Sequence, residues 1–371
     1  MMDNLLLNTA TRVFSDICTP ALKEAGEEGH FSTEAWALLV ETGLVLANTS
    51  EDRGGVGASA YEMAEILRIA GSQALPLPLP EVFLAETALS AAGLPPAETP
   101  LTVAPAIAGE RLEAVCHNGA WTVRGTLHMV PWGRHLDIVT IAATCDGPLT
   151  VVLRRPAEIK AGMNLANEPR DRVTFMGAEV LAAGEPGKGL SATQLYLAGA
   201  LARSVQTVGA MERIRDLTVE YAQARQQFGR PLAKFQAVQQ QIAVLASQVA
   251  ACQAAVDGAV EASAAGPATF EIAAAKAVTG EATGTVAAIA HQIHGAMGFT
   301  HEYPLHLNTR RIWSWREEFG TEAEWQRWIG RNMKALGGAG IWPFLSAKAK
   351  NPPVEIDAQA TCVQASAPCV I

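Results

Sequence analysis

Cysteine is sparse in this sequence, and its distribution excludes several common kinds of site. The six cysteines are scattered and form no CxxC pair, so neither a zinc ribbon nor a disulfide framework is expected. A reducing compartment fits this pattern, and we expect the cytoplasm. No uninterrupted apolar run is long enough to span a bilayer. The first residues carry no basic region followed by an apolar core, so no export signal is expected.

Positive charge is also in short supply. The formal net charge is −9, which argues against a broad nucleic-acid-binding surface. The sequence has no internal repeat, no GxGxxG turn after a predicted strand, and no nucleophile placed beside a base. Function therefore has to be sought in the longer motifs.

The periodicity of apolar residues changes twice along the sequence, which predicts a mainly α protein with a central β-domain. Residues up to about Leu94 have helical periodicity, interrupted by a turn cluster at 51–57 and a Pro-rich connector at 75–80. Strands are predicted at 121–125, 136–141, 149–153 and 172–175. The predicted boundaries are 1–99 for an N-terminal helical domain, 100–189 for a middle β-domain, 190–345 for a C-terminal helix bundle and 346–371 for a polar tail.

Two long motifs lie in the predicted bundle, where apolar residues recur every three or four positions. Residues 221–239 read YAQARQQFGRPLAKFQAVQ. Residues 290–325 read AHQIHGAMGFTHEYPLHLNTRRIWSWREEFGTEAEW, with a helix end, a glycine turn and a second helix that ends near Phe319. In this order and separation the two motifs resemble the acyl-CoA dehydrogenase family. The resemblance implies an N-terminal helical domain, a β-barrel-like middle domain and a C-terminal four-helix bundle.

The resemblance also implies a reaction and a cofactor. The family oxidises an acyl-CoA to its 2-enoyl form: a glutamate removes the α-proton and FAD takes the β-hydrogen as hydride. Electron-transfer flavoprotein is the implied electron acceptor. In the family, FAD lies between two subunits. The β-domain of one subunit holds the flavin ring, and the bundle of the neighbour holds the ADP end.

The resemblance implies that this chain carries the ADP-binding half of the site. Arg225 offers a planar fork of donors to a pyrophosphate, and Phe228 can lie along the adenine or ribose. Glycine and alanine after a helix end leave room for the nucleotide. The predicted cofactor-binding residues are Arg225, Phe228, Gln236, Gln292, Ile293, His294, Gly295, Ala296 and Thr321.

The half that holds the flavin ring departs from the family pattern. No TEPxxGS-like loop occurs between Pro100 and Gly125. Met129 stands at the position of the tryptophan that covers the ring in the family, and Pro131 at that of a serine or threonine. Proline has neither an N–H nor a hydroxyl to offer. One alternative is that Trp132 replaces the missing ring contact.

The catalytic glutamate is absent from its family position, which is Phe319 in this sequence. The alternative position used by some members falls on Gly199 and Ala200, which cannot serve either. Glu317 and Glu318 are neighbours of Phe319, but successive helix residues point about 100° apart. We therefore expect both to be solvated surface charges, with Glu318 the remaining candidate for a relocated base.

Other charged and metal-binding side chains are given no catalytic role. Glu212 and Glu220 are expected to be surface charges on a bundle helix. His291 and His294 are three residues apart, but no third ligand has suitable spacing, so no metal site is expected.

These observations favour one hypothesis. The chain is one subunit of a heteromeric acyl-CoA dehydrogenase, an αβ pair or α2β2 tetramer of the kind that oxidises bulky steroid side-chain CoA esters. It contributes the ADP-binding residues, and a second dehydrogenase-like subunit supplies the base and the flavin-ring contacts. Two alternatives remain: a homomeric dehydrogenase with Glu318 as base, and a non-redox scaffold or acyl-CoA-binding member of the fold.

Overall fold

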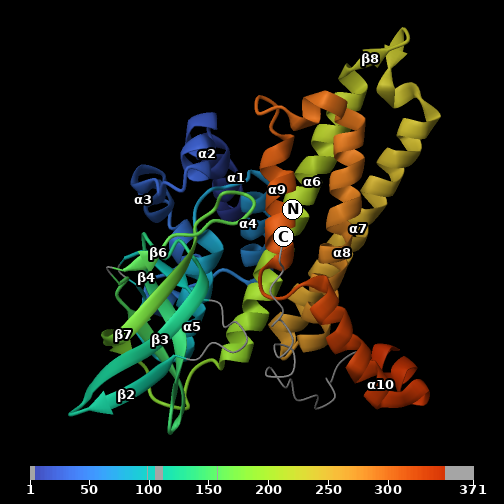
Figure 1. Cartoon of the computed structure of the whole chain (residues 1–371). Coiled ribbons are helices and arrows are strands. Elements are labelled where there is room, and N and C mark those ends of the chain that lie inside the picture. The colour runs from blue at the N-terminus through green and yellow to red at the C-terminus, as the bar shows by residue number, and fades with distance from the viewer. Residues whose placement is uncertain (1–4, 98, 105–111, 157, 347–371) are drawn as a thin grey trace. The chain divides into compact units, whose positions relative to one another are not determined.

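The computed structural model describes residues 5–97, 99–104, 112–156 and 158–346 (Figure 1). Contacts within the chain divide it into two compact units. The bundle unit comprises the described parts of Met1–Lys23, Ala60–Pro76 and Ala200–Pro352. The sheet unit comprises those of Glu24–Ser59 and Leu77–Gly199.

The bundle unit is helical, as the periodicity of the sequence predicts. The predicted apolar stripes are buried, for example at Val208 and Met211 in one helix and at Val249 and Val256 in the next. Its helices are α1 (Leu5–Ile17), α4 (Ala60–Ser72), most of α6 (Ala192–Ala224), α7 (Gln236–Ala265), α8 (Thr269–His294), α9 (Leu305–Glu317) and α10 (Glu322–Ser346), with short turns η3 (Leu232–Lys234) and η4 (Gly295–Phe299). Helix α2 (Pro20–Glu27) crosses from the bundle unit into the sheet unit.

Helices α4 and α6 approach each other backbone to backbone. A Cβ added at Gly209 would lie 1.9 Å from the carbonyl oxygen of Arg68, and one at Gly71 would lie 2.2 Å from that of Gln206. Only glycine fits at such distances. Contacts therefore group α4 with the bundle unit and not with residues 24–59.

The sheet unit contains a seven-stranded sheet with helices α3 (Thr33–Glu41) and α5 (Leu79–Ala91) and turns η1 (Leu44–Leu46) and η2 (Glu51–Arg53). The strand order is β1-β4-β2-β3-β7-β5, and β5 also pairs with β4, so that five strands close on themselves. Apolar side chains such as Val123, Leu149 and Phe175 fill the core. The strands are β1 (Leu101–Val103), β2 (Glu113–His117), β3 (Ala120–Pro131), β4 (Asp137–Thr144), β5 (Gly147–Leu153), β6 (Ile159–Lys160) and β7 (Arg170–Ala183).

This arrangement confirms the predicted fold class, a mainly α protein with a barrel-like β region in the middle of the chain. The four predicted strands overlap β3, β4, β5 and β7, with one of them starting a residue before β4, whereas β1, β2 and β6 were not predicted. Helix α5 begins at Leu79, so Pro80 lies in its first turn and not in a connector. The domain boundaries stay a prediction, and residues 347–371 of the predicted tail lie outside the described residues.

One described helix, α7, is long and apolar enough by length and composition to cross a membrane. Leu245, Val249 and Cys252 on this helix are buried in the bundle unit. A single helix of this kind is weak evidence for a membrane span, because core helices of bundles pass the same test.

Candidate functional site

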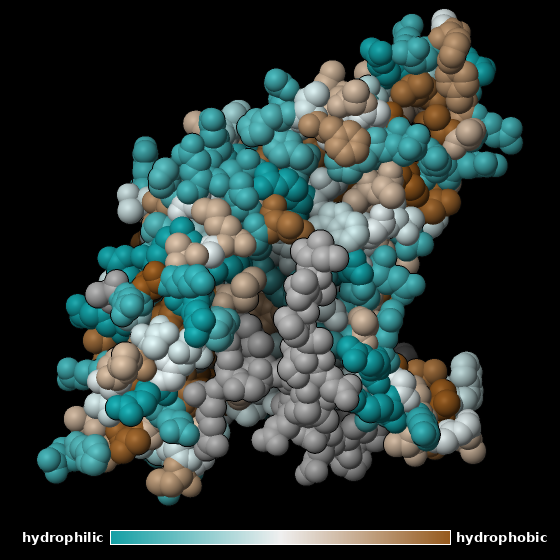
Figure 2. Space-filling view, viewed as in Figure 1, coloured by the Kyte–Doolittle hydropathy of each residue, from teal (hydrophilic) through white to brown (hydrophobic). Residues whose placement is uncertain are grey.

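A short hairpin protrudes from the bundle unit between α6 and α7 (Figure 1). Strands β8 (Gln226–Gln227) and β9 (Arg230–Pro231) are joined by Phe228 and Gly229, whose φ angles are 52° and 79°. Two positive φ values in a two-residue loop are the signature of a type I′ turn. The turn leaves the Phe228 side chain 92% exposed, with Arg225 and Gln236 exposed at either side. Figure 2 shows hydrophobic and hydrophilic residues intermixed on this protruding end.

A glycine turn follows α8. Gly295 has φ 58° and ψ −138°, and a Cβ added there would meet nothing within 4 Å. Gln292 and Ala296 are exposed beside it. Gly298 is needed for a different reason, because a Cβ there would lie 2.9 Å from Cβ of His294. The turn thus presents open backbone next to an exposed amide side chain.

The structure brings these two sequence-distant motifs to one end of the bundle unit. The Arg225 N–H donates to the carbonyl oxygen of Tyr221 at 2.8 Å. The Tyr221 ring stacks on the His294 ring, with centroids 4.5 Å apart. The last turns of α6 and α8 are therefore in contact, directly beneath the hairpin and the glycine turn. We call this surface the cradle, defined by Arg225, Phe228, Gln236, Gln292, Gly295 and Ala296.

Two of the predicted cofactor-binding side chains do not face the cradle. Ile293 is 7% exposed and His294 is 2% exposed, so both side chains point into the bundle unit. Only their backbone groups remain available to a ligand. That Ile293 and His294 belong to the cofactor-binding residues stays a prediction.

Thr321 lies at the other end of α9 and is not part of the cradle. The 13 residues of α9 separate Thr321 from the glycine turn by about 20 Å. Thr321 Oγ1 accepts a hydrogen bond from the Glu324 N–H at 3.3 Å, and Glu324 Oε2 accepts one from the Thr321 N–H at 2.8 Å. This reciprocal pair is a capping box at the start of α10. The structure thus gives Thr321 a local role that the motif alone did not reveal.

Phe319 stands where the resemblance places the family's base. Its side chain is 5% exposed, and its φ of 55° lies in the left-handed region. The Trp325 Nε1–H donates to its carbonyl oxygen at 3.0 Å. The segment after α9 is thereby held with an aromatic ring, not a carboxylate, inside the bundle unit.

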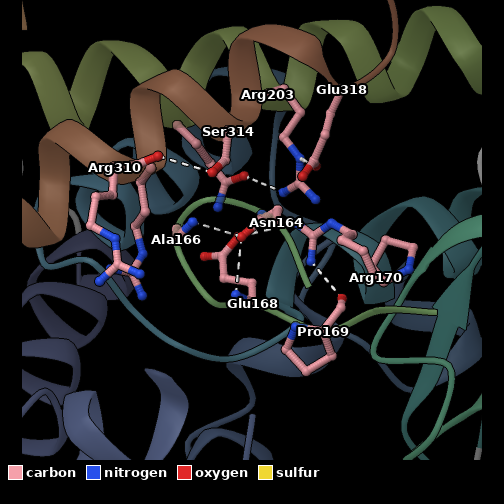
Figure 3. A network of polar contacts seen from close by, with 12 residues as sticks. Asn164, Ala166, Glu168, Pro169, Arg170, Arg203, Arg310, Ser314 and Glu318 are labelled. Carbon is pink, nitrogen blue, oxygen red and sulfur yellow. Dashed lines mark hydrogen bonds and ion pairs between the residues drawn. The ribbon is translucent and has the colours of Figure 1, made fainter. Parts of the chain in front are cut away.

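Glu318 is not the solvated surface charge that the sequence predicted. Its side chain is 10% exposed, and Arg203 Nε donates to its Oε2 at 2.7 Å (Figure 3). Arg203, on α6, also donates to Gln206 Oε1 at 2.6 Å. The prediction was wrong because residues 318 and 203 are distant in sequence, and only the fold pairs them. The pairing ties Oε2 of this carboxylate to Arg203 inside the bundle unit.

Comparison with known proteins places the chain among its relatives. A model of the acyl-CoA dehydrogenase C-terminal domain matches residues 187–341. The acyl-CoA dehydrogenase IpdE2 of Mycobacterium tuberculosis is 33% identical over 282 residues, which cover 76% of this chain and 80% of that protein. The chain belongs to the acyl-CoA dehydrogenase family. It is therefore an oxidoreductase by family.

Solved structures of the family share the fold. The ChsE4-ChsE5 complex from Mycobacterium tuberculosis has a TM-score of 0.81 at 26% identity, covering 88% of this chain and 95% of that one. The Tcur3481-Tcur3483 steroid ACAD has a TM-score of 0.80 at 23% identity, covering 90% of this chain and 98% of that one.

A buried lysine of this family member was missed by sequence reasoning. Lys276, on α8, is 2% exposed, and its Nζ donates to the carbonyl oxygens of Trp315 at 2.9 Å and Arg316 at 2.8 Å. Burial lowers the pKa of Lys276 to about 8, against the opposing field of Glu318 and other carboxylates. The sequence feature that could have predicted its burial is a single lysine within an alanine-rich apolar stripe.

Glu212 is a second correction. Its side chain is 21% exposed, and it lies 3.8 Å from Arg68 NH1, which belongs to an ion-pair cluster that joins α4 to Asp257 on α7. Burial raises the pKa of Glu212, against the lowering effect of Arg68. Glu220 is exposed, as predicted. Neither residue lies in the cradle.

The two histidines considered for metal binding have other contacts. His291 Nε2 lies 3.1 Å from Thr309 Oγ1, and its ring stacks on Phe299 at 4.6 Å. His294 Nδ1 lies 2.7 Å from the carbonyl oxygen of Ala290. These contacts hold the start of α9 and the glycine turn against α8.

In the sheet unit, the residues at the flavin-ring positions form part of a bulged strand. Met129 has φ 54° at a register shift between β3 and β7. The Pro131 carbonyl oxygen accepts a hydrogen bond from Thr102 Oγ1 at 2.6 Å. Trp132 is 3% exposed and packs with Phe31 and His135, so it has no open face with which to cover a ring. Part of the region searched for the TEPxxGS loop, residues 105–111, lies outside the described residues.

A polar network in the loop before β7 was also missed (Figure 3). Glu168 Oε2 accepts hydrogen bonds from Asn164 Nδ2 at 2.9 Å and from Arg170 NH2 at 3.1 Å. Arg170 is buried, and its NH1 also donates to the carbonyl oxygen of Pro169. The network fixes a loop of the sheet unit, and no motif in the sequence marks it.

Proposed function

We propose that this chain is one subunit of an FAD-dependent acyl-CoA dehydrogenase that oxidises an acyl-CoA to a 2-enoyl-CoA. The active site that it serves is completed by a second subunit of the same family. The observation that carries the proposal is the buried Phe319 at the position of the base, beside a Glu318 already paired with Arg203. A phenyl ring accepts no proton, so this chain needs a carboxylate from elsewhere.

The cradle fits the ADP end of FAD. Arg225 offers a guanidinium to the pyrophosphate, Phe228 offers an exposed aromatic face, and Gln236 and Gln292 offer exposed amides. Gly295 leaves space in which a side chain would otherwise intrude. FAD, when bound, supplies the hydride acceptor. This chain's part is to bind and orient the nucleotide end.

The second subunit has to supply what this chain does not. Among the described residues, Met129 and Pro131 replace the family's flavin-ring contacts, and neither side chain donates a hydrogen bond. The partner therefore provides the flavin-ring contacts and the base. A heterotetramer with two copies of each subunit is the assembly that we propose. Electron-transfer flavoprotein stays the proposed electron acceptor.

The proposed substrate is the CoA ester of a bulky, steroid-derived acyl group. Its support is the solved structure described as a steroid ACAD, whose fold this chain shares with a TM-score of 0.80. The ChsE4-ChsE5 structure, a complex of two differently named chains, supports the heteromeric assembly.

Expression with and without a partner tests the proposal. The full chain is purified alone and together with a dehydrogenase-like protein encoded next to it that carries the family glutamate. We expect the chain alone to be colourless and inactive. The pair should show flavin absorbance and reduce ferrocenium with acyl-CoA. A yellow, active homomer would overturn the proposal. Acyl-CoA binding without flavin in every assembly would favour the scaffold alternative.

One substitution distinguishes the proposed heteromer from the alternative, a homomer that uses Glu318 as its base. Glu318→Gln should leave the turnover of the paired enzyme largely intact once folded protein is compared, because the partner supplies the base. If Glu318 were the base, turnover would fall by several orders of magnitude while flavin stayed bound. The ion pair with Arg203 favours the first result.

A further inference from the structure

His294 lies at the centre of an aromatic cluster under the cradle. Its ring centroid is 4.5 Å from that of Tyr221 on α6 and 4.9 Å from that of Tyr303, which precedes α9. Tyr221 and Tyr303 meet edge to face, with centroids 5.9 Å apart. Aromatic pairs at these distances add stability beyond the area that they bury. Three segments of the bundle unit therefore meet on one ring.

Hydrogen bonds fix both the tautomer and the orientation of this ring. The carbonyl oxygen of Ala290 can only accept, so His294 Nδ1 carries a hydrogen and donates to it at 2.7 Å. In the neutral ring Nε2 is then an acceptor for the Tyr303 hydroxyl, which lies 3.2 Å from it and 3.5 Å from the carbonyl oxygen of Leu217 on α6. Burial lowers the pKa of His294, which keeps the ring neutral near pH 7, as this arrangement requires.

The cluster connects directly to both halves of the cradle. His294 is the residue before Gly295, and its Cβ is what leaves no room for a side chain at Gly298. Tyr221 accepts the backbone hydrogen bond of Arg225. A movement of the His294 ring would therefore displace the glycine turn relative to the α6 end and its arginine.

We propose that His294 is a positioning residue that links the ends of α6 and α8, so that Arg225 and the Gly295 turn hold the nucleotide as one preformed surface. We call the contacts of His294 with Tyr221, Tyr303 and Ala290 the clasp. The inference rests on the proposed function for its cofactor, and on the described contacts for the clasp. Preformed sites bind more tightly because less ordering is left to the moment of binding. Arg225 and Gly295 lie 70 positions apart in the sequence, so a physical link between them is needed.

Two substitutions at one position separate the parts of the clasp. His294→Phe keeps a ring for stacking but removes both hydrogen bonds. His294→Gln keeps donor and acceptor groups but removes the ring. Tyr303→Phe removes only the hydroxyl that faces Nε2 and is mild enough to fold. His117→Phe is the matched control, because His117 is an exposed histidine of the sheet unit.

Hydrogen–deuterium exchange of the full chain reports on the clasp without any cofactor. We expect exchange to rise in both segments, 225–230 and 295–299, in His294→Phe and in His294→Gln. Tyr303→Phe should show a smaller rise, and His117→Phe none. If exchange rises only in 295–299, the two ends are not linked through His294 and the clasp is refuted.

Binding of FAD to the paired enzyme, measured by equilibrium ultrafiltration, tests the consequence. We expect the Kd for FAD to rise about tenfold in His294→Phe and about threefold in Tyr303→Phe, the range that one or two hydrogen bonds allow. The kcat at saturating FAD should not change. An unchanged Kd despite faster exchange would refute the positioning role. If the unsubstituted pair binds no FAD, the proposed function fails, while the exchange result still decides whether the clasp exists.

Discussion

The two ends of helix α9 in the bundle unit differ in what their side chains do. Near its start, the cradle exposes Arg225 and Phe228, and among the described residues the Arg225 guanidinium has no hydrogen bond or ion pair. Near its end, Glu318 is paired with Arg203 and Phe319 is buried. The end near Arg225 and Phe228, here called the open end, keeps polar groups available for a ligand. The end at Glu318 and Phe319, here called the sealed end, uses its polar groups in contacts within the chain.

The difference shows how a family site can be divided. A side chain kept for a ligand stays unsatisfied within its own chain, because its partner arrives with the ligand. Beside the buried Phe319, charged side chains are paired inside the bundle unit. Lys276 and Arg203 are both buried, and both donate hydrogen bonds to the segment around Glu318.

The largest effect is expected from breaking the sealed end. Glu318→Ala leaves Arg203 buried without its carboxylate, which costs about 3–5 kcal/mol in the free energy of unfolding. Urea unfolding of the full chain measures this cost. Glu317→Ala is the control, because that carboxylate is exposed and its removal should change stability by less than about 0.5 kcal/mol. Equal effects of the two substitutions would mean that Glu318 is not structural and would reopen its role as a base.

Much of this comparison could be predicted from residue order. Helix periodicity located α6, α7 and α8, and the two motifs located the exposed cradle residues, because a motif and a stripe are local patterns. The absence of a carboxylate at Phe319 was equally readable. What these features share is that one stretch of chain defines them.

The rest depends on pairing between distant residues, which local patterns do not encode. Glu318 looks like a surface charge until α6 brings Arg203 beside it. The packing of His294 against Tyr221 and Tyr303 likewise joins three segments of the chain that no single motif contains. Thr321 followed three residues later by Glu324 is a capping-box pattern that the sequence does contain.

At the open end, Arg225→Ala should weaken FAD without weakening the fold. Charge-assisted hydrogen bonds of the kind that a guanidinium makes to phosphate contribute about 1.5–3 kcal/mol, so the Kd for FAD of the paired enzyme should rise roughly 10- to 100-fold. The urea midpoint should stay unchanged, because Arg225 is exposed. Arg230→Ala is the control, because the Arg230 guanidinium already stacks on a ring of its own chain. Its Cζ lies 4.1 Å from the centroid of the Phe235 ring. Similar losses for both arginines would show only a general charge effect.

Lys276 makes the sealed end sensitive to alkaline pH. Its pKa is about 8 in the folded chain and 10.5 in the unfolded chain, so above pH 8 the unfolded state binds more protons. The Lys276 contribution to the free energy of unfolding should therefore rise by about 1 kcal/mol between pH 8 and pH 9. From about pH 8 upward the buried thiols of Cys18 and Cys252, whose pKa values burial raises from 9.0 to about 11 and about 12, act in the opposite direction and offset part of this rise.

The contribution of Lys276 is isolated by subtraction. Lys276→Met keeps both thiols, so the difference in the free energy of unfolding between the two proteins should change by about 1 kcal/mol between pH 8 and pH 9. Urea unfolding at four or five pH values in this window provides the comparison. A rise that persists in Lys276→Met must come from another group.

The smallest expected effect decides whether Thr321 caps α10 or contacts the cofactor. Thr321→Ala removes the cap of α10 and should cost about 1 kcal/mol in the free energy of unfolding, which Thr321→Ser should restore. The Kd for FAD of the paired enzyme should not change, because α9 separates Thr321 from the cradle. A rise in Kd with unchanged stability would instead return Thr321 to the cofactor, and the sealed end of α9 would then carry a ligand contact of its own.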